Sequence, residues 1–130
     1  MMLYPDGPRE PRATVSGILW PHTLAEVAPM TAFEAKDAGT LAEENMRKIG
    51  IDWMTFEGKR FPYRSKTKAT HYRLIVNAMR AKLKQNPEVR RVLLSTGNLI
   101  LRPDPKEEPD PPPEWRYFQI WMEFRAKLRP

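Results

Sequence analysis

The stretch TKATHYRLIVNAMRAKLKQNPEVRRVLLSTG, residues 67–97, decides the fold. Its apolar residues recur at three- and four-residue spacing, which places them on one face of an α-helix. These residues are Tyr72, Ile75, Val76, Met79 and Leu83. Lysine, arginine and asparagine occupy much of the remaining surface of the same helix. The pattern predicts a long amphipathic helix that buries one side.

Asn86-Pro87 interrupts this helix, because proline disfavours an α conformation for the residue before it. Pro87 also suits the first position of a new helix, where no amide donor is needed. Val89, Val92 and Leu93 then form a second apolar face, and Gly97 is a suitable left-handed stop. We therefore expect a central helical hairpin over residues 68–96.

Two capping-box patterns precede the hairpin, Thr31–Glu34 and Thr40–Glu43, each with a hydroxyl and a carboxylate three residues apart. With Gly39 between them and Gly50 after them, they predict two helices, at 32–38 and 41–49. A further helix is expected at 115–128, where helical spacing resumes.

Strand signals are few. Ile18-Leu19-Trp20 is an apolar cluster that fits a short strand or an anchor on the core, and 98–101 is a short apolar run that predicts a strand. Residues 54–56 and 60–61 flank the turn Glu57-Gly58 and predict a small hairpin. The fold class is therefore mainly α, or α+β with two or three short strands.

A chain of 130 residues fits one domain. We expect a proline-rich arm over residues 1–17, with little regular structure, and one helical domain over 18–130. Within that domain, residues 102–114 hold six prolines and five acids and predict an exposed loop. This loop is either a solvated linker or an acidic lid beside a basic site.

Composition narrows the function classes. The net charge of +6 favours anionic partners such as nucleic acid, nucleotides or an acidic protein surface. The chain has no cysteine, and its two histidines, His22 and His71, are far apart, so neither a zinc-thiolate site nor another metal site is expected. No run is long and apolar enough for a membrane span, and no signal-peptide pattern opens the chain. These features predict a cytoplasmic protein without a membrane partner or cofactor.

Aromatic and basic residues interleave between residues 51 and 68. Aromatic rings stack on bases and cations contact phosphate, so this interleaving suits a nucleotide or single-stranded nucleic acid. The alternative is that the rings are core and the cations are their solvated neighbours.

From about Tyr72 to Leu128 the sequence resembles the NADAR superfamily, small α-rich N-glycosidase-like domains linked to NAD and ADP-ribose metabolism. The elements that carry the resemblance are Met79, KLKQNP at 82–87, LLSTG at 93–97, Trp115 and WMEFR at 121–125; upstream, TAFEAKDAG at 31–39 and Trp53 also fit. The family's catalytic-glutamate element has no counterpart before Thr31, and Tyr117-Phe118 replace its Gly/Asn-rich element. The resemblance implies a domain that binds, and in active members hydrolyses, an ADP-ribose-type or nucleotide N-riboside.

Cleavage of an N-glycosidic bond passes through an oxocarbenium-like state that a carboxylate must stabilise. The candidate acid is Asp110 or Glu114. Candidate ligand contacts are Trp53 and Trp115 as stacking walls and Arg64 or Lys82 as phosphate contacts. This hypothesis predicts a pocket in which both tryptophans meet a carboxylate.

Two non-catalytic alternatives remain from the sequence. One is a small basic module that binds nucleic acid through a continuous stripe with strongly salt-dependent affinity; the stripe would comprise Lys59, Arg60, Arg64, Lys66, Lys68 and Arg73. The other is a viral or mobile-element type of factor that binds a host protein through an exposed apolar patch.

Overall fold

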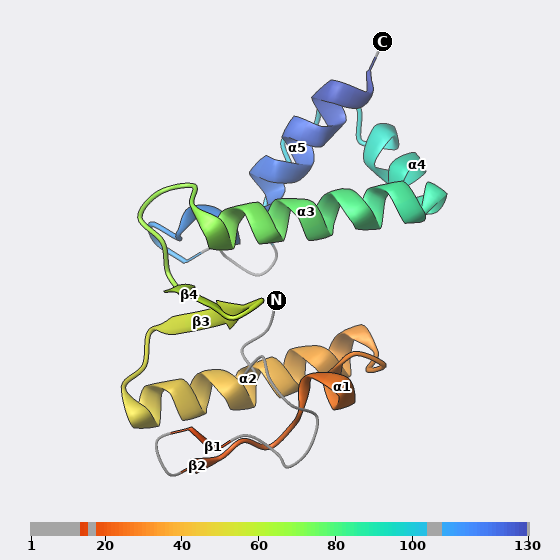
Figure 1. Ribbon diagram of the computed structural model, residues 1–130. Helices are drawn as coiled ribbons and strands as arrows, with labels where there is room; N and C mark the ends of the chain where they lie inside the picture. Colours follow the sequence, from red (N-terminus) through yellow and green to blue (C-terminus); the bar gives the residue numbers. More distant parts are fainter. Residues whose placement is uncertain (1–13, 16–17, 104–107, 130) are drawn as a thin grey trace. The chain divides into compact units, whose positions relative to one another are not determined.

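The computed structural model describes residues 14–15, 18–103 and 108–129, and it is mainly helical, as predicted (Figure 1). Contacts divide the chain into two compact units, Met1–Tyr63 and Arg64–Pro130, here called unit 1 and unit 2. The predicted boundaries, an arm over 1–17 and one domain over 18–130, stay predictions. Most of that arm lies outside the described residues, but Thr14–Val15 forms a strand that the sequence did not indicate.

Helix α2, Ala32–Ile49, dominates unit 1. It begins with the predicted capping box between Thr31 and Glu34 and ends at Gly50, whose φ of 69° lies in the left-handed region. The predicted break at Gly39 is wrong, because the helix continues through it. The second capping box is also wrong, since the Thr40 hydroxyl donates to the Lys36 carbonyl inside the helix instead of capping it.

The core of unit 1 forms where α2 meets the segment before it. Strand β1, Thr14–Val15, pairs antiparallel with β2, Ile18–Leu19, and the short helix α1, Leu24–Val27, follows. Thr23 caps α1 through a reciprocal pair of hydrogen bonds with Glu26. The buried cluster contains Trp20, Val27, Ala38, Ala42 and Met46.

The predicted hairpin is confirmed and completes unit 1. Strand β3, Trp53–Phe56, pairs antiparallel with β4, Lys59–Pro62, in the register Met54↔Phe61. The turn residues Glu57 and Gly58 both have positive φ, 50° and 75°, as a two-residue type I′ turn requires. Met54 and Phe61 are the buried members of their strands.

Unit 2 is built on the predicted helical hairpin (Figure 1). Helix α3, Thr70–Gln85, ends before Pro87, which starts α4, Pro87–Ser95. The last helix, α5, covers Tyr117–Leu128, after the 3₁₀ turn η1 at Pro113–Trp115. One buried cluster joins the three helices through Met79, Leu93, Ile120 and Phe124.

The strand predicted at 98–101 is wrong. The described residues of unit 2 contain no strand, so this apolar run has no pairing partner, and Leu99 and Ile100 are exposed. The expected loop at 102–114 is irregular up to η1 where it is described; residues 104–107 lie outside the described part.

Candidate functional site

The six predicted site residues fall in both units. Trp53 belongs to unit 1, whereas Arg64, Lys82, Asp110, Glu114 and Trp115 belong to unit 2. The predicted meeting of Trp53 and Trp115 around one carboxylate therefore stays a prediction, and each residue is described within its own unit.

Trp53 lies on β3 and is half-buried. The guanidinium carbon of Arg60, on the paired strand β4, lies 3.7 Å from the centroid of the Trp53 ring, a cation–π contact. One face of the ring is therefore already covered by a cation. A base stacking on Trp53 would have to use the other face or displace Arg60.

A cation also lies over the ring of Trp115, in unit 2. The guanidinium carbon of Arg64 lies 4.5 Å from the Trp115 ring centroid, and its Nη2 donates to Glu108 Oε1 at 2.7 Å. Arg64 thus joins an aromatic face to a carboxylate of the proline-rich segment. The predicted phosphate contact and the predicted stacking wall are neighbours, but Glu108 already neutralises the cation.

Glu114 is fully buried, with a side-chain exposure of 0%. Its Oε1 accepts a hydrogen bond of 2.7 Å from the Ser65 backbone N–H and lies 3.3 Å from Nδ1 of His71, which is 2% exposed. Its Oε2 is buried and has no hydrogen-bond partner among the described residues. A carboxylate in this position ties η1 to the start of α3.

Asp110, the other candidate acid, is the opposite case. Its side chain is 99% exposed, and its only described ion pair is a 3.5 Å contact with Arg116 Nη2. Arg116 is held in addition by its Nε, which donates to the Pro111 carbonyl at 3.0 Å. The two candidate acids therefore have opposite environments: Glu114 is buried among its partners, whereas Asp110 is exposed to solvent.

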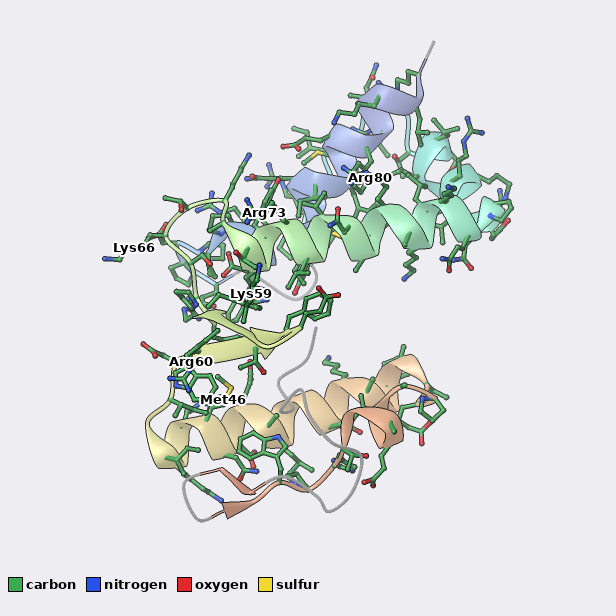
Figure 2. All side chains as sticks on the ribbon, viewed as in Figure 1. Met46, Lys59, Arg60, Lys66, Arg73 and Arg80 are labelled. Carbon is green, nitrogen blue, oxygen red and sulfur yellow. The ribbon has the colours of Figure 1, made fainter. Side chains whose placement is uncertain are left out.

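The exposed surface of α3 carries a row of polar side chains, here called the α3 stripe: Arg73, Asn77, Arg80 and Lys84 (Figure 2 labels Arg73 and Arg80). Spacings of four, three and four residues align them along about 16 Å of helix. Lys82, the predicted phosphate contact, is exposed but lies about two and a half turns from Arg73, on the other side of the helix.

The stripe's cations lack carboxylate partners in the part of unit 2 that the structure describes. Arg73 donates to the Thr70 hydroxyl and Arg80 to the Asn77 side-chain oxygen, both neutral groups. Arg91 on α4 differs, because both its Nε and Nη2 donate to Glu88. That pairing lowers the pKa of Glu88 and raises the pKa of Arg91.

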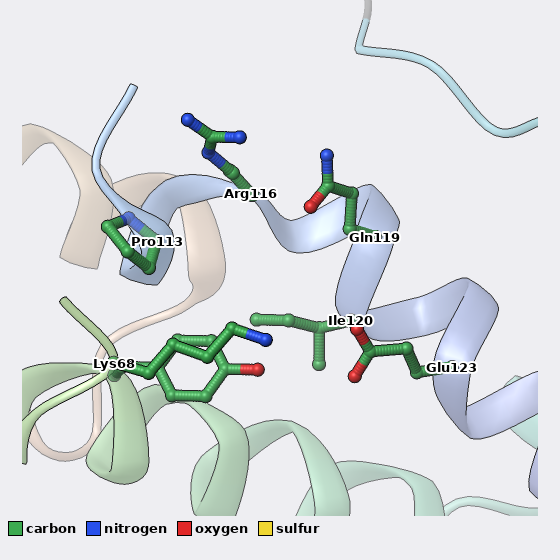
Figure 3. Close-up of a pocket in the computed structure, with 7 residues that line it drawn as sticks. Lys68, Pro113, Arg116, Gln119, Ile120 and Glu123 are labelled. Carbon is green, nitrogen blue, oxygen red and sulfur yellow. The ribbon is translucent and has the colours of Figure 1, made fainter. Parts of the chain in front are cut away.

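In the described part of unit 2, two of the cavities border α5. The smaller, of about 100 Å³, is lined by the loop before α3 and by α3, η1 and α5, and Figure 3 shows Lys68 and Glu123 extending into it from opposite sides. The larger, of about 370 Å³, is lined by Leu101, Arg102, Pro103, Arg116, Phe118, Gln119 and Met122. Arg116 and Gln119 border both cavities.

Sequence reasoning missed the polar side chains that unit 2 buries. His71 lies in the first turn of α3 and Arg125 in α5, where it is 7% exposed and donates to the Thr96 hydroxyl at 2.7 Å. In the sequence, Arg125 stands in the basic C-terminal end of this helix with Lys127 and Arg129, a position that usually is exposed. The helical spacing of Phe118, Trp121 and Arg125 on one side of α5 was the available signal for its burial.

No family model, no curated protein and no solved structure matches this chain. Within the described residues, no cluster of three or more His, Asp or Glu side chains is arranged to hold a metal ion. No helix in the same residues is both long enough and apolar enough to cross a membrane.

Proposed function

We propose that unit 2 binds nucleic acid through the phosphate backbone. The observation that carries this proposal is a run without acids: from Arg64 to Pro87 there are seven Lys or Arg residues and no Asp or Glu. Most of these cations are exposed on the loop before α3 and on α3 itself. Backbone recognition needs such a cationic surface and no particular base contact.

Charge is distributed unevenly between the two units. Residues 64–130 hold fifteen Lys or Arg against seven Asp or Glu, a net charge of +8, whereas residues 1–63 hold seven against nine, a net charge of −2. The whole excess of positive charge therefore belongs to unit 2. A polyanion would be attracted to unit 2, and its affinity would fall with salt.

The α3 stripe is the best candidate contact surface. Arg73, Arg80 and Lys84 keep their charge free of described carboxylates, and about 16 Å of helix accommodates several phosphates of one strand. Lys59 and Arg60, which the sequence placed in the same basic stripe, belong to unit 1, so the continuity of that longer stripe stays a prediction.

The test measures binding of a fluorescent single-stranded oligonucleotide at several salt concentrations. The triple variant Arg73→Gln, Arg80→Gln, Lys84→Gln is expected to weaken binding and to reduce the slope of log K against log salt by about 2. The matched control removes three exposed cations from α2 through Lys36→Gln, Arg47→Gln and Lys48→Gln. Equal weakening in both triples, or an unchanged slope in the first, would count against the α3 stripe.

The NADAR resemblance supports a second proposal, that an ADP-ribose-type ligand binds at Trp115. The specific observation in its favour is the Arg64–Trp115 pair, which combines an aromatic face with a cation 4.5 Å away. A phosphate of the ligand would have to replace Glu108 as the partner of that cation. Calorimetric titration with ADP-ribose tests it. Saturable heat that disappears in Trp115→Ala supports the proposal and calls for a turnover assay, whereas absence of heat from the parent chain rejects it.

A further inference from the structure

The two cavities beside α5 differ in the charge of their walls. The smaller cavity has cations and an acid, because Glu123 lines it together with Lys68 and Arg116. The larger cavity has the cations Arg102 and Arg116 and, among the described residues that line it, no acid. Of these two cavities, the charges of the described lining residues give an electrostatic preference for an anion to the larger one.

The remaining wall of the larger cavity is apolar, with a single amide. Leu101, Pro103, Phe118 and Met122 offer hydrocarbon, aromatic and thioether surface, and Gln119 offers one amide. Its volume of about 370 Å³ lies near the lower end of small-molecule sites, which span roughly 300–1,000 Å³. An apolar wall with few converging polar groups is the usual composition of such sites.

The two arginines have different constraints. Arg116 is fixed by the Pro111 carbonyl, and its contact with Asp110 is weakened by solvent, since that carboxylate is 99% exposed. Arg102 is exposed and forms no ion pair within the described residues. One fixed and one unengaged guanidinium at the edge of an apolar cavity suit an acid group, which guanidinium binds in a forked geometry.

We propose that the larger cavity binds a small amphipathic anion, with a planar or aliphatic body against Phe118 and Met122 and one acid group at Arg102 and Arg116. This site is separate from the α3 stripe and does not depend on nucleic-acid binding. Its ligand class is defined by one acid group on an apolar body of ten to twenty non-hydrogen atoms, roughly what such a volume holds.

The probe for the experiment is 1-anilinonaphthalene-8-sulfonate, an aromatic body with one acid group, titrated into the full chain and followed by fluorescence. N-phenyl-1-naphthylamine, nearly the same body without the acid, is the neutral counterpart. We expect saturable binding of the sulfonate and much weaker binding of the amine. Arg102→Gln is expected to weaken sulfonate binding about fivefold, the effect of losing one charge-assisted hydrogen bond from an exposed side chain.

Two further variants separate this site from the rest of the surface. Met122→Glu, which places a carboxylate in the cavity wall, is expected to abolish sulfonate binding, whereas Arg90→Gln, on exposed α4, leaves it unchanged. A cooperative thermal transition by circular dichroism confirms that each variant is folded, since loosened proteins also bind this dye. Displacement by 1-naphthoate or 1-naphthyl phosphate supports the site and shows which acid group it prefers.

The proposal is overturned by any of three results. Equal binding of the neutral amine would mean an apolar groove without anion preference. Sulfonate binding that is unaffected by Arg102→Gln, or equally reduced by Arg90→Gln, would place the dye elsewhere. No saturable binding by a folded parent chain would show that the cavity takes no such ligand.

Discussion

Replacing Glu114 by alanine is expected to lower the free energy of unfolding by about 3–5 kcal/mol. The carboxylate is 0% exposed, lies 3.3 Å from the buried His71 ring and accepts the Ser65 N–H at 2.7 Å. Removing one partner of a buried pair leaves the other without compensation, which costs about this much. Since a domain is stable by only about 5–15 kcal/mol, a large share of the stability of unit 2 depends on this group.

The assay is urea unfolding of the full chain, followed by far-UV circular dichroism. A double-mutant cycle with His71→Ala separates the pair from its surroundings: the double variant should cost at least about 1 kcal/mol less than the sum of the single variants. Glu108→Ala is the matched control, because it removes a carboxylate of the same segment that is 45% exposed and pairs with Arg64. Its expected cost is under about 1 kcal/mol.

The reasoning fails on either of two results. If Glu114→Ala costs no more than Glu108→Ala, the carboxylate does not hold η1 to α3. If the two single variants are additive, His71 and Glu114 are buried next to each other without stabilising one another.

Three further predictions concern single elements. The Thr31 hydroxyl and amide lower the pKa of Glu34 below its ordinary value of 4.5, so the α2 cap stabilises the fold above that value. This contribution to stability is lost as pH falls through the lowered pKa. In an acid titration followed by circular dichroism, the Thr31→Ala variant should therefore lose less stability over this pH range than the parent chain does. Gly50→Ala should cost about 1 kcal/mol in urea unfolding, because its φ is 69°. Arg125→Met should lower thermal stability by about 1–3 kcal/mol through the lost Thr96 bond, and a neutral effect would contradict that bond's role.

Local signals predicted the elements of unit 2 well, since proline, asparagine and helical spacing act within a few residues. The hairpin at Asn86-Pro87 follows from the backbone preferences of those two residues alone. The strand predicted at 98–101 is wrong because strand formation does not depend on the local segment alone. A strand needs a second strand to pair with, and the residues of one segment do not show whether such a partner lies beside it.

The merged helix α2 shows packing overriding a local preference. Glycine costs about 1 kcal/mol in a helix interior, which favoured a break at Gly39. Ala38, Ala42 and Met46 recur every four residues and are all buried in the cluster with Trp20. Burial of an apolar face is worth several times the glycine cost, so the helix continues.

The sequence offered candidate site residues, whose roles stay predictions, but it could not indicate which side chains pair with one another. His71 and Glu114 are 43 positions apart in the chain, and no periodicity links them. The same holds for Arg64, whose partners Glu108 and Trp115 lie beyond the whole helical hairpin. Such contacts follow from the return of η1 to the start of α3, which only the folded chain shows.

The pairing of acids in unit 2 leaves the cations of the α3 stripe without a described carboxylate partner. Four of the acids that the structure describes in this unit contact a specific basic side chain, and none of those partners lies on the α3 stripe. The pairs are Glu88 with Arg91, Glu108 with Arg64, Asp110 with Arg116 and Glu114 with His71. Carboxylates that are already paired compete weakly for further cations, so the α3 stripe keeps its full attraction for phosphate. The composition of +6 alone could not distinguish this arrangement from evenly mixed charges, which would bind a polyanion far less well.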